Sequence, residues 1–145
     1  MKKYLLILAA ITCLLCSCLK DEFNVFSPSS IHIGAEGGEV TVKARTPMQW
    51  CAFGINYISV YEKDKNGQYI NKEFIEYKKS TDALSVGESG DLGYVTATFV
   101  NSTTLKFAIA PCDEAIHMNI HIYIENKSKK GKWFAPDEII IYQNK

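Results

Sequence analysis

Apolar side chains recur at every second position along most of this chain, and that period of two most restricts its fold. The longest run has Ile116, Met118, Ile120, Ile122 and Ile124 separated by single residues. Because successive side chains of a strand point to opposite faces, this alternation predicts a strand with one buried face. Further strands are predicted at residues 31–33, 40–44, 57–61, 69–77, 95–99, 105–109 and 139–142, with an apolar cluster at 50–53. No segment after residue 17 has helical periodicity, so we expect an all-β sandwich of about eight strands.

The dipeptide Asn66-Gly67 lies between two of these runs and predicts a β-hairpin. For a two-residue loop, the register pairs Lys65 with Gln68, Val60 with Glu73, and Ile58 with Ile75. We expect the hairpin to bury the face that carries the following side chains: Ile58, Val60 and Ile75. The opposite face then carries Tyr57, Tyr61, Ile70 and Phe74, with Lys63 and Lys72.

Three aromatic residues of that second face are candidate ligand-binding residues: Tyr57, Tyr61 and Phe74. Flat rings on an exposed sheet can stack on the rings of sugars. The alternative is that another strand or loop covers this face, so that the rings are part of the core. Trp133, which follows a polar turn at residues 127–132, is a fourth candidate. The alternative for Trp133 is that it is one of the first buried residues of the last strand.

The first 17 residues resemble a cleavable export signal. Two lysines precede an apolar run over residues 5–15, which is too short to span a bilayer and fits a signal peptide. The sequence Leu15-Cys16-Ser17-Cys18 resembles the lipobox of bacterial lipoproteins. We therefore expect Cys18 to be the first residue of the mature chain and to carry the lipid that anchors it to the outer membrane. An ordinary signal peptide that contains cysteines is the alternative.

The sequence after this cysteine, Leu19-Lys20-Asp21-Glu22, resembles the surface-export signal of Bacteroidetes lipoproteins. It predicts display on the cell surface, with an outer-membrane lipoprotein that faces the periplasm as the alternative. Residues 18–29 lack periodicity and are expected to form a lipidated tether. Residues 30–145 then form one domain of ordinary size.

Two of the five cysteines lie inside the predicted domain. Cys51 and Cys112 would meet an oxidising compartment, where a disulfide can persist. Two buried free thiols are the equally weighted alternative, because the sequence does not show whether their Cα atoms come close enough to bridge.

Composition and spacing argue against several classes of function. Removing Lys2 and Lys3 with the signal leaves 14 of 16 basic residues against 16 acidic ones, so no basic surface for nucleic acid is expected. His117 and His121 share a strand face about 13 Å apart, too far to hold one zinc ion together. We expect all three histidines to be structural or solvated. No nucleophile motif or catalytic triad stands out, so we expect no enzyme, metal or cofactor.

Several motifs resemble those of BACON domains, the Bacteroidetes-associated β-sandwich modules. Residues 35–42 read AEGGEVTV, Trp50 follows, residues 57–60 read YISV, and residues 139–144 read IIIYQN. The chain departs from the family in having Tyr57 where a Trp is usual, and in lacking an Arg-x-Gly stretch before the penultimate strand. The resemblance implies an immunoglobulin-like antiparallel sandwich that binds carbohydrate or mucin, or that acts as a spacer.

Together these observations predict a non-catalytic surface lipoprotein with one BACON-like domain. Its leading predicted function is the binding of a glycan or glycoprotein. The alternative is a structural or partner-binding subunit of a surface complex, which would use a sheet edge or an apolar face.

Overall fold

The computed structural model describes residues 24–76, 79–128, 130–131, 134 and 136–144. These residues form an all-β sandwich of two sheets, as predicted, and no helix occurs among them. The ten strands are β1 (Phe26–Ser27), β2 (Ser30–Ile33), β3 (Gly38–Ala44), β4 (Met48–Lys63), β5 (Tyr69–Glu76), β6 (Ser89–Asp91), β7 (Val95–Asn101), β8 (Thr104–Ile109), β9 (Ile116–Ser128) and β10 (Asp137–Gln143).

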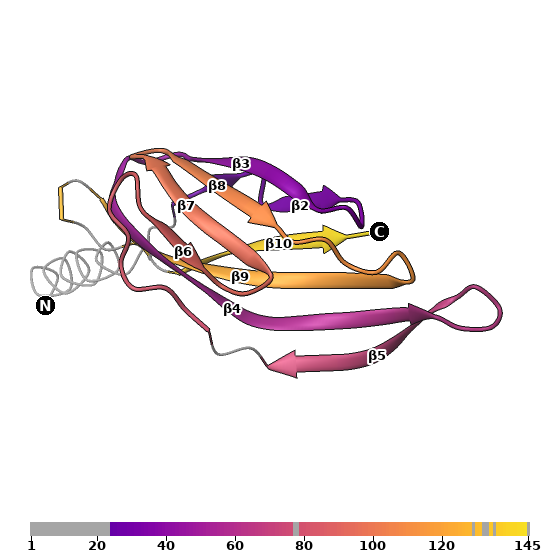
Figure 1. Ribbon diagram of the computed structural model, residues 1–145. Coiled ribbons are helices and arrows are strands. Elements are labelled where there is room, and N and C mark those ends of the chain that lie inside the picture. The colour runs from indigo at the N-terminus through magenta and orange to yellow at the C-terminus, as the bar shows by residue number, and fades with distance from the viewer. Residues whose placement is uncertain (1–23, 77–78, 129, 132–133, 135, 145) are drawn as a thin grey trace, which may run out of the picture.

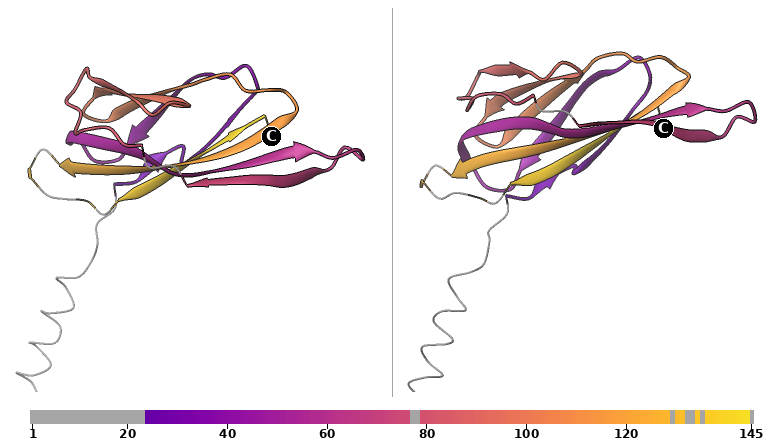
Figure 2. Two further views of the ribbon diagram at one scale, coloured as in Figure 1. Left: turned by 60° about the horizontal axis from the view of Figure 1, so that its bottom comes forward. Right: turned by 90° about the horizontal axis from the view of Figure 1, so that it is seen from below.

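The strands form two five-stranded sheets that pack face to face (Figures 1 and 2). One sheet has the order β1-β3-β8-β7-β6 and the other has the order β2-β10-β9-β4-β5. The sandwich is not entirely antiparallel, because β2 pairs with β10 in the parallel sense. The hairpin formed by β4 and β5 extends beyond the end of the sandwich (Figure 1).

Strand β4 is one continuous strand that includes both the apolar cluster at residues 50–53 and the strand predicted at residues 57–61. Phe53 and Ile55 are buried at odd positions, whereas Ile58 is buried at an even one. An irregularity in the pairing with β9, between Ile55 and Tyr57, accounts for this change of parity. A bulge of this kind adds one residue to a strand, so the apolar face moves by one position and the strand continues.

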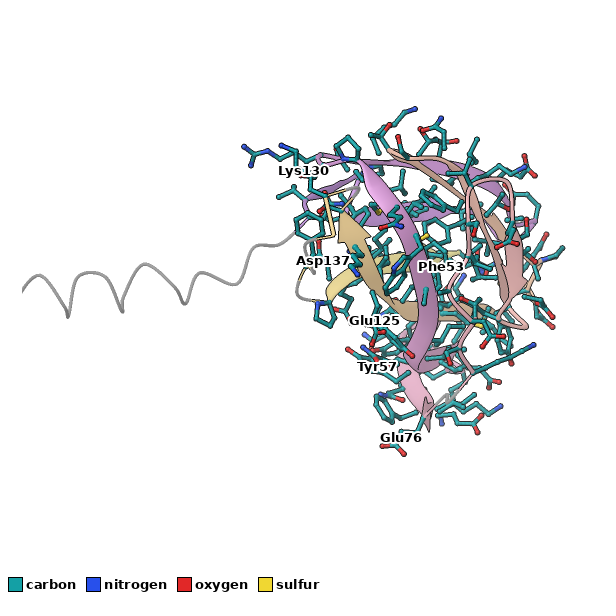
Figure 3. All side chains as sticks on the ribbon, turned by 90° about the vertical axis from the view of Figure 1, so that its left-hand side faces the viewer. Phe53, Tyr57, Glu76, Glu125, Lys130 and Asp137 are labelled. Atoms are coloured by element: carbon teal, nitrogen blue, oxygen red, sulfur yellow. The ribbon has the colours of Figure 1, made fainter. Side chains whose placement is uncertain are left out.

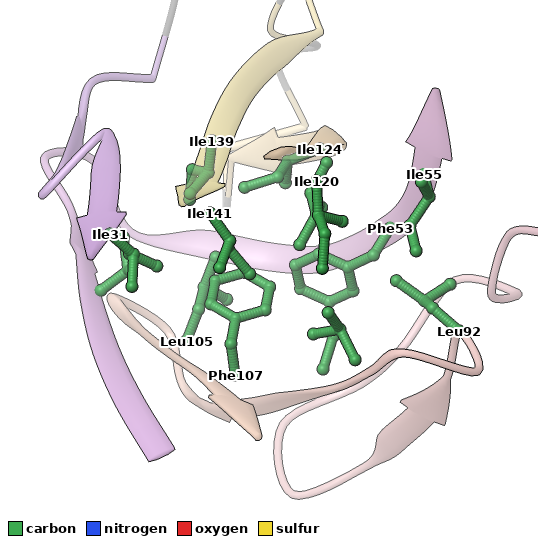
Figure 4. Close-up of a cluster of buried hydrophobic side chains, with 14 of the residues drawn as sticks. Ile31, Phe53, Ile55, Leu92, Leu105, Phe107, Ile120, Ile124, Ile139 and Ile141 are labelled. Carbon is green, nitrogen blue, oxygen red and sulfur yellow. The ribbon is translucent and has the colours of Figure 1, made fainter. Parts of the chain in front are cut away.

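The core lies between the sheets and draws its side chains from both. Phe53 of β4 meets Phe107 of β8 edge to face, with ring centroids 5.7 Å apart, and both rings are fully buried. Five isoleucines of β9 and β10 belong to the same core cluster: Ile120, Ile122, Ile124, Ile139 and Ile141. Figure 4 shows Ile120, Ile124, Ile139 and Ile141 between the sheets with Phe53 and Phe107. The period-two apolar pattern of β9 therefore supplies one wall of the core, as the sequence predicts.

Part of the register predicted for the β4–β5 hairpin is confirmed, and the rest is wrong. The pairs of Val60 with Glu73 and of Ile58 with Ile75 are present. The predicted pair of Lys65 with Gln68 is wrong, because Lys63 pairs with Tyr69 across a longer loop. A register shift after Val60 compensates for the difference. As a result Ile70 lies opposite Glu62, on the face away from the tyrosines, where the sequence did not place it.

The loop of this hairpin is held by one carboxylate. Oδ1 of Asp64 accepts hydrogen bonds from the backbone N–H groups of Asn66 and Gln68, at 2.8 Å and 2.9 Å. These bonds, the one from Gln68 first, lower the pKa of the Asp64 carboxyl. Asp-mediated capping of this kind orders a turn without any ion.

The sandwich begins earlier than the predicted tether allows. Asn24 is fully buried and donates from Nδ2 to Oδ1 of Asn126, while Phe26 is buried and pairs with Ala44. A two-residue strand and a buried amide have no periodicity, so alternation does not reveal them. Residues 79–93, which lie between the strands predicted from alternation, likewise contain β6, and Leu84 and Leu92 of this segment enter the core.

Candidate functional site

The outer face of the sheet β2-β10-β9-β4-β5 carries an unusual set of side chains, here called the aromatic face. On β2, β4, β9 and β10 its members alternate with buried side chains of the same strand, so they point away from the core. The aromatic face consists of His32, Tyr57, Tyr61, Tyr69, Phe74, His117, Asn119, His121 and Tyr142. All five strands of the sheet contribute to it.

Cross-strand register explains how these rings meet. Tyr142 of β10 lies opposite His32 on one side and Asn119 on the other. On β4, Tyr57 lies opposite His121 and Tyr61 lies opposite His117. Directly opposite side chains on one face of a sheet are close enough to pack, so the rings form a continuous layer.

Each of the three histidines stacks on a tyrosine ring. The planes are within 25° of parallel in every pair, and the centroid distances are 4.9 Å for His32–Tyr142, 3.9 Å for His121–Tyr57 and 3.7 Å for His117–Tyr69. Phe74 of the edge strand stacks on Tyr57 at 4.9 Å. Mutual stacking fixes the ring orientations, so that a ligand would meet a preformed surface.

The Glu138 carboxylate lies at one end of this layer and contacts the ring of His121. Oε1 of Glu138 lies 3.0 Å from Nδ1 of His121, whose ring in turn stacks on Tyr57. Burial first, and then the negative charge of Glu138, raise the pKa of the Tyr57 hydroxyl. Tyr57 therefore keeps its proton at neutral pH and can donate a hydrogen bond. Figure 3 shows Tyr57 and Glu76 at the β5 side of the sheet.

A hollow of about 340 Å³ opens on the aromatic face near the hairpin. Tyr61, Tyr69, His117 and Asn119 line it. Its volume lies at the lower end of the range for small-molecule sites. Two ring systems beside an amide and an imidazole offer both stacking surface and hydrogen-bond donors and acceptors.

The outer face of the other sheet has a different chemistry. Threonines and lysines of β3, β7 and β8 cover it, and its ion pair joins Lys106 to Glu39 at 2.9 Å. Lys43 donates to Oγ1 of Thr104 at 2.8 Å. Such a face is an ordinary solvated sheet surface. Aromatic side chains therefore gather on the outer face of the sheet β2-β10-β9-β4-β5 and not on the outer face of the other sheet.

The structure brings three of the four predicted ligand contacts together. Tyr57, Tyr61 and Phe74 share the aromatic face, and no strand covers them in the described part of the chain. Phe74 is 59% exposed, while the two tyrosines are half-buried among neighbouring rings. Trp133 and the predicted lipid-carrying Cys18 lie outside the described residues.

Sequence reasoning missed the histidines, Tyr69 and Asn119 as members of this face. His117, Asn119 and His121 alternate with buried residues of β9, and that alternation was the available signal. The partners come from other strands, so their stacking depends on a register that the sequence does not specify. Within the described ranges, no three His, Cys, Asp or Glu side chains gather as metal ligands.

The suggested disulfide between Cys51 and Cys112 does not form, and both are free cysteines. Cys51 lies opposite Asn126 at one end of β9, whereas Cys112 lies beside Ile116 at the other end. Ten residues of strand span about 33 Å, and bridged Cα atoms are usually under about 7 Å apart. Of the two readings left open by the sequence, the structure has the free thiols.

The two thiols are expected to differ in reactivity. Burial raises the pKa of Cys51 to about 12, so only about one in ten thousand of its thiols is ionised at pH 8. Cys112 is only partly buried, although burial and the Asp113 carboxylate also raise its pKa. We expect iodoacetamide at pH 8 to label Cys112 first, with peptide mass spectrometry as the readout. Equal labelling of both in the folded protein would contradict the buried position of Cys51.

The chain has few informative similarities to known proteins. No family model matches the sequence, and no curated protein does. One similar structure concerns T cell specificity and activation by the bacterial superantigen toxic shock syndrome toxin-1 (TM-score 0.30, 9% identity, 81% of this chain and 93% of that one). Another is the CsuC–CsuE chaperone–tip adhesion subunit complex of Csu pili from Acinetobacter baumannii (TM-score 0.34, 10% identity, 84% of this chain).

The present chain spans just over half of that pilus chain, 56% of its length. Likeness at this level carries no functional information. Among the residues that the structure describes, no helix is long and apolar enough to cross a membrane.

Proposed function

We propose that this protein is a non-catalytic lipoprotein of the outer membrane surface that binds glycans through its aromatic face. The observation that carries the proposal is the hollow lined by Tyr61, Tyr69, His117 and Asn119. Sugar rings have apolar C–H faces and a rim of hydroxyls. A site for them combines exposed ring surface with amide and imidazole groups that exchange hydrogen bonds with hydroxyls.

The position of the hollow suits a molecule anchored at its N-terminus. Asn24 lies at the end of β9 where it bonds Asn126, and His117 lies near the other end of the same strand. Asn126 and His117 are nine positions apart on β9, so the two ends are separated by about 30 Å. A lipid on Cys18, which the lipobox-like sequence supports, would therefore leave the hollow facing away from the membrane.

Removing the aromatic side chains of the hollow is expected to weaken glycan binding. We expect the Tyr61→Ala/Tyr69→Ala variant to lose binding at least tenfold, roughly 1.4 kcal/mol or more, because the aromatic lining of the hollow disappears. The measurement is a glycan array with the full chain purified in detergent, followed by calorimetry on the strongest binder.

A Thr41→Ala/Thr96→Ala variant is the matched control, because both residues lie on the strands of the opposite sheet, outside the aromatic face. It is expected to bind as the unaltered protein does. If no plant, mucin or microbial glycan binds the unaltered protein, or if the double tyrosine variant binds equally well, the glycan proposal fails.

One observation favours a second candidate function, that of a partner-binding subunit. Strand β5 is at the edge of its sheet and carries two exposed apolar side chains, Ile70 and Phe74. An exposed edge strand can pair with a strand of another protein. Lys72, Glu73 and Glu76 place charges along this strand, and charges on an edge oppose such pairing.

A further inference from the structure

One fixed positive charge lies at the rim of the hollow. The ammonium of Lys63 is 5.2 Å from the centroid of the Tyr69 ring, and Tyr69 lines the hollow. Lys63 follows Tyr61 by two positions on β4 and pairs directly with Tyr69, so it shares the aromatic face. Among the described residues, no carboxylate oxygen lies within ion-pair distance of its ammonium.

Nearby carboxylates point elsewhere or are held by other groups. Glu62 and Glu73 lie opposite Ile70 and Val60 on the other face of the hairpin, and Glu62 is ion-paired to Lys72. The Asp64 carboxylate accepts its hydrogen bonds from the backbone of the hairpin loop. The hollow thus has a positive rim without an ion-paired carboxylate.

The acidic groups of the aromatic face lie at its other end. Glu76 is opposite Tyr57, and Glu138 is bonded to His121, which is also opposite Tyr57. Six residues of strand separate Tyr57 from Lys63, a distance of about 20 Å. Charge is therefore distributed asymmetrically over the aromatic face, with negative charge near Tyr57 and positive charge at the hollow.

We infer that the hollow selects saccharides that carry an anionic group, a carboxylate or a sulfate ester. This inference rests on the proposed function and names its ligand class. The sugar ring stacks on Tyr61 and packs against the edge of Tyr69, the Asn119 amide bonds hydroxyls, and the anionic group faces the Lys63 ammonium. A charge-assisted hydrogen bond between this ammonium and the anionic group gives both added affinity and one preferred orientation of the sugar.

Matched saccharides test the inference. Calorimetry with the full chain in detergent compares a neutral oligosaccharide with the same oligosaccharide bearing a sialic acid, a hexuronic acid or a sulfate ester. We expect an acidic member to bind roughly tenfold more tightly than the neutral one, as one charge-assisted hydrogen bond would give. This ratio should shrink as sodium chloride is raised from about 0.05 to 0.5 M, because salt screens exposed charges.

Two lysine variants locate the effect. Lys63→Gln should bring the acidic-to-neutral affinity ratio close to one. Lys72→Gln, on the same hairpin but paired with Glu62 on the other face, should retain the ratio of the unaltered protein. Preference for the carboxylated saccharide, the sulfated one or both supports the inference and identifies the group.

Equal affinity for neutral and acidic saccharides overturns the inference while leaving glycan binding in place. A preference that persists in Lys63→Gln overturns it as well, because the charge must then come from elsewhere. Binding to neither kind of saccharide overturns the proposed function, and the inference with it.

Discussion

Phe53→Ala is expected to lower the free energy of unfolding by roughly 3–5 kcal/mol, the range for removing a buried phenylalanine. The Phe53 ring is fully buried on β4 and contacts Phe107 of the opposite sheet edge to face. Removing the Phe53 ring leaves a cavity between the two sheets, where it packs on Phe107. Because a domain of this size is stable by only about 5–15 kcal/mol, much of the total stability would be lost. Urea unfolding followed by tryptophan fluorescence measures the change.

Phe74→Ala is the matched control for this change. The same side chain is removed, but Phe74 is 59% exposed on the aromatic face, so we expect a loss below about 1 kcal/mol. A midpoint for Phe53→Ala that equals the midpoint of Phe74→Ala would show that the sheets do not pack through Phe53.

Gly37→Ala is expected to destabilise the protein by roughly 3 kcal/mol or more, the sum of backbone strain and overpacking. Gly37 turns the chain between β2 and β3 with a φ of 68°, which L side chains rarely adopt. An added Cβ would lie 2.3 Å from the carbonyl oxygen of Ile109, and a backbone atom cannot move aside as a side chain can. The same urea titration measures the loss.

A second glycine separates the two causes. Gly67 has a similar φ of 76°, but a Cβ added there meets no atom within 4 Å. Gly67→Ala should therefore cost only the strain of the left-handed conformation, about 1–2 kcal/mol. Equal losses in the two variants would mean that the β2–β3 turn relaxes away from Ile109.

Alternation along the chain predicts the strands well where the ladder is regular. Strand β9 is the clearest case, and the hairpin at Asn66-Gly67 follows from turn chemistry alone. The pattern fails where a bulge changes parity, as between Ile55 and Tyr57, because no residue type marks such a position. It also fails at β1, whose two residues are too few to show a period.

The candidate site is less predictable than the fold for a related reason. Tyr57, Tyr61 and Phe74 can be grouped from one hairpin, because the predicted pairs of Val60 with Glu73 and of Ile58 with Ile75 are present. His117, His121 and their stacking partners come together only when β9 and β10 are placed beside that hairpin. A site assembled from five strands requires four registers, and the sequence predicts only part of one of them, that of the β4–β5 hairpin.

The pairing of β2 with β10 determines how the domain would respond to pulling. Strands β1 and β2 both start at the end of the sandwich that carries Asn24, and the hollow lies at the other end. Tension between a membrane anchor and a glycan held in the hollow would act along the strands. In that direction the hydrogen bonds of a ladder resist together, whereas a perpendicular pull opens them one at a time. On the proposed function, we expect the two-residue pairing of β1 with β3 and the four-residue pairing of β2 with β10 to yield first, and the long ladder of β4 with β9 to hold.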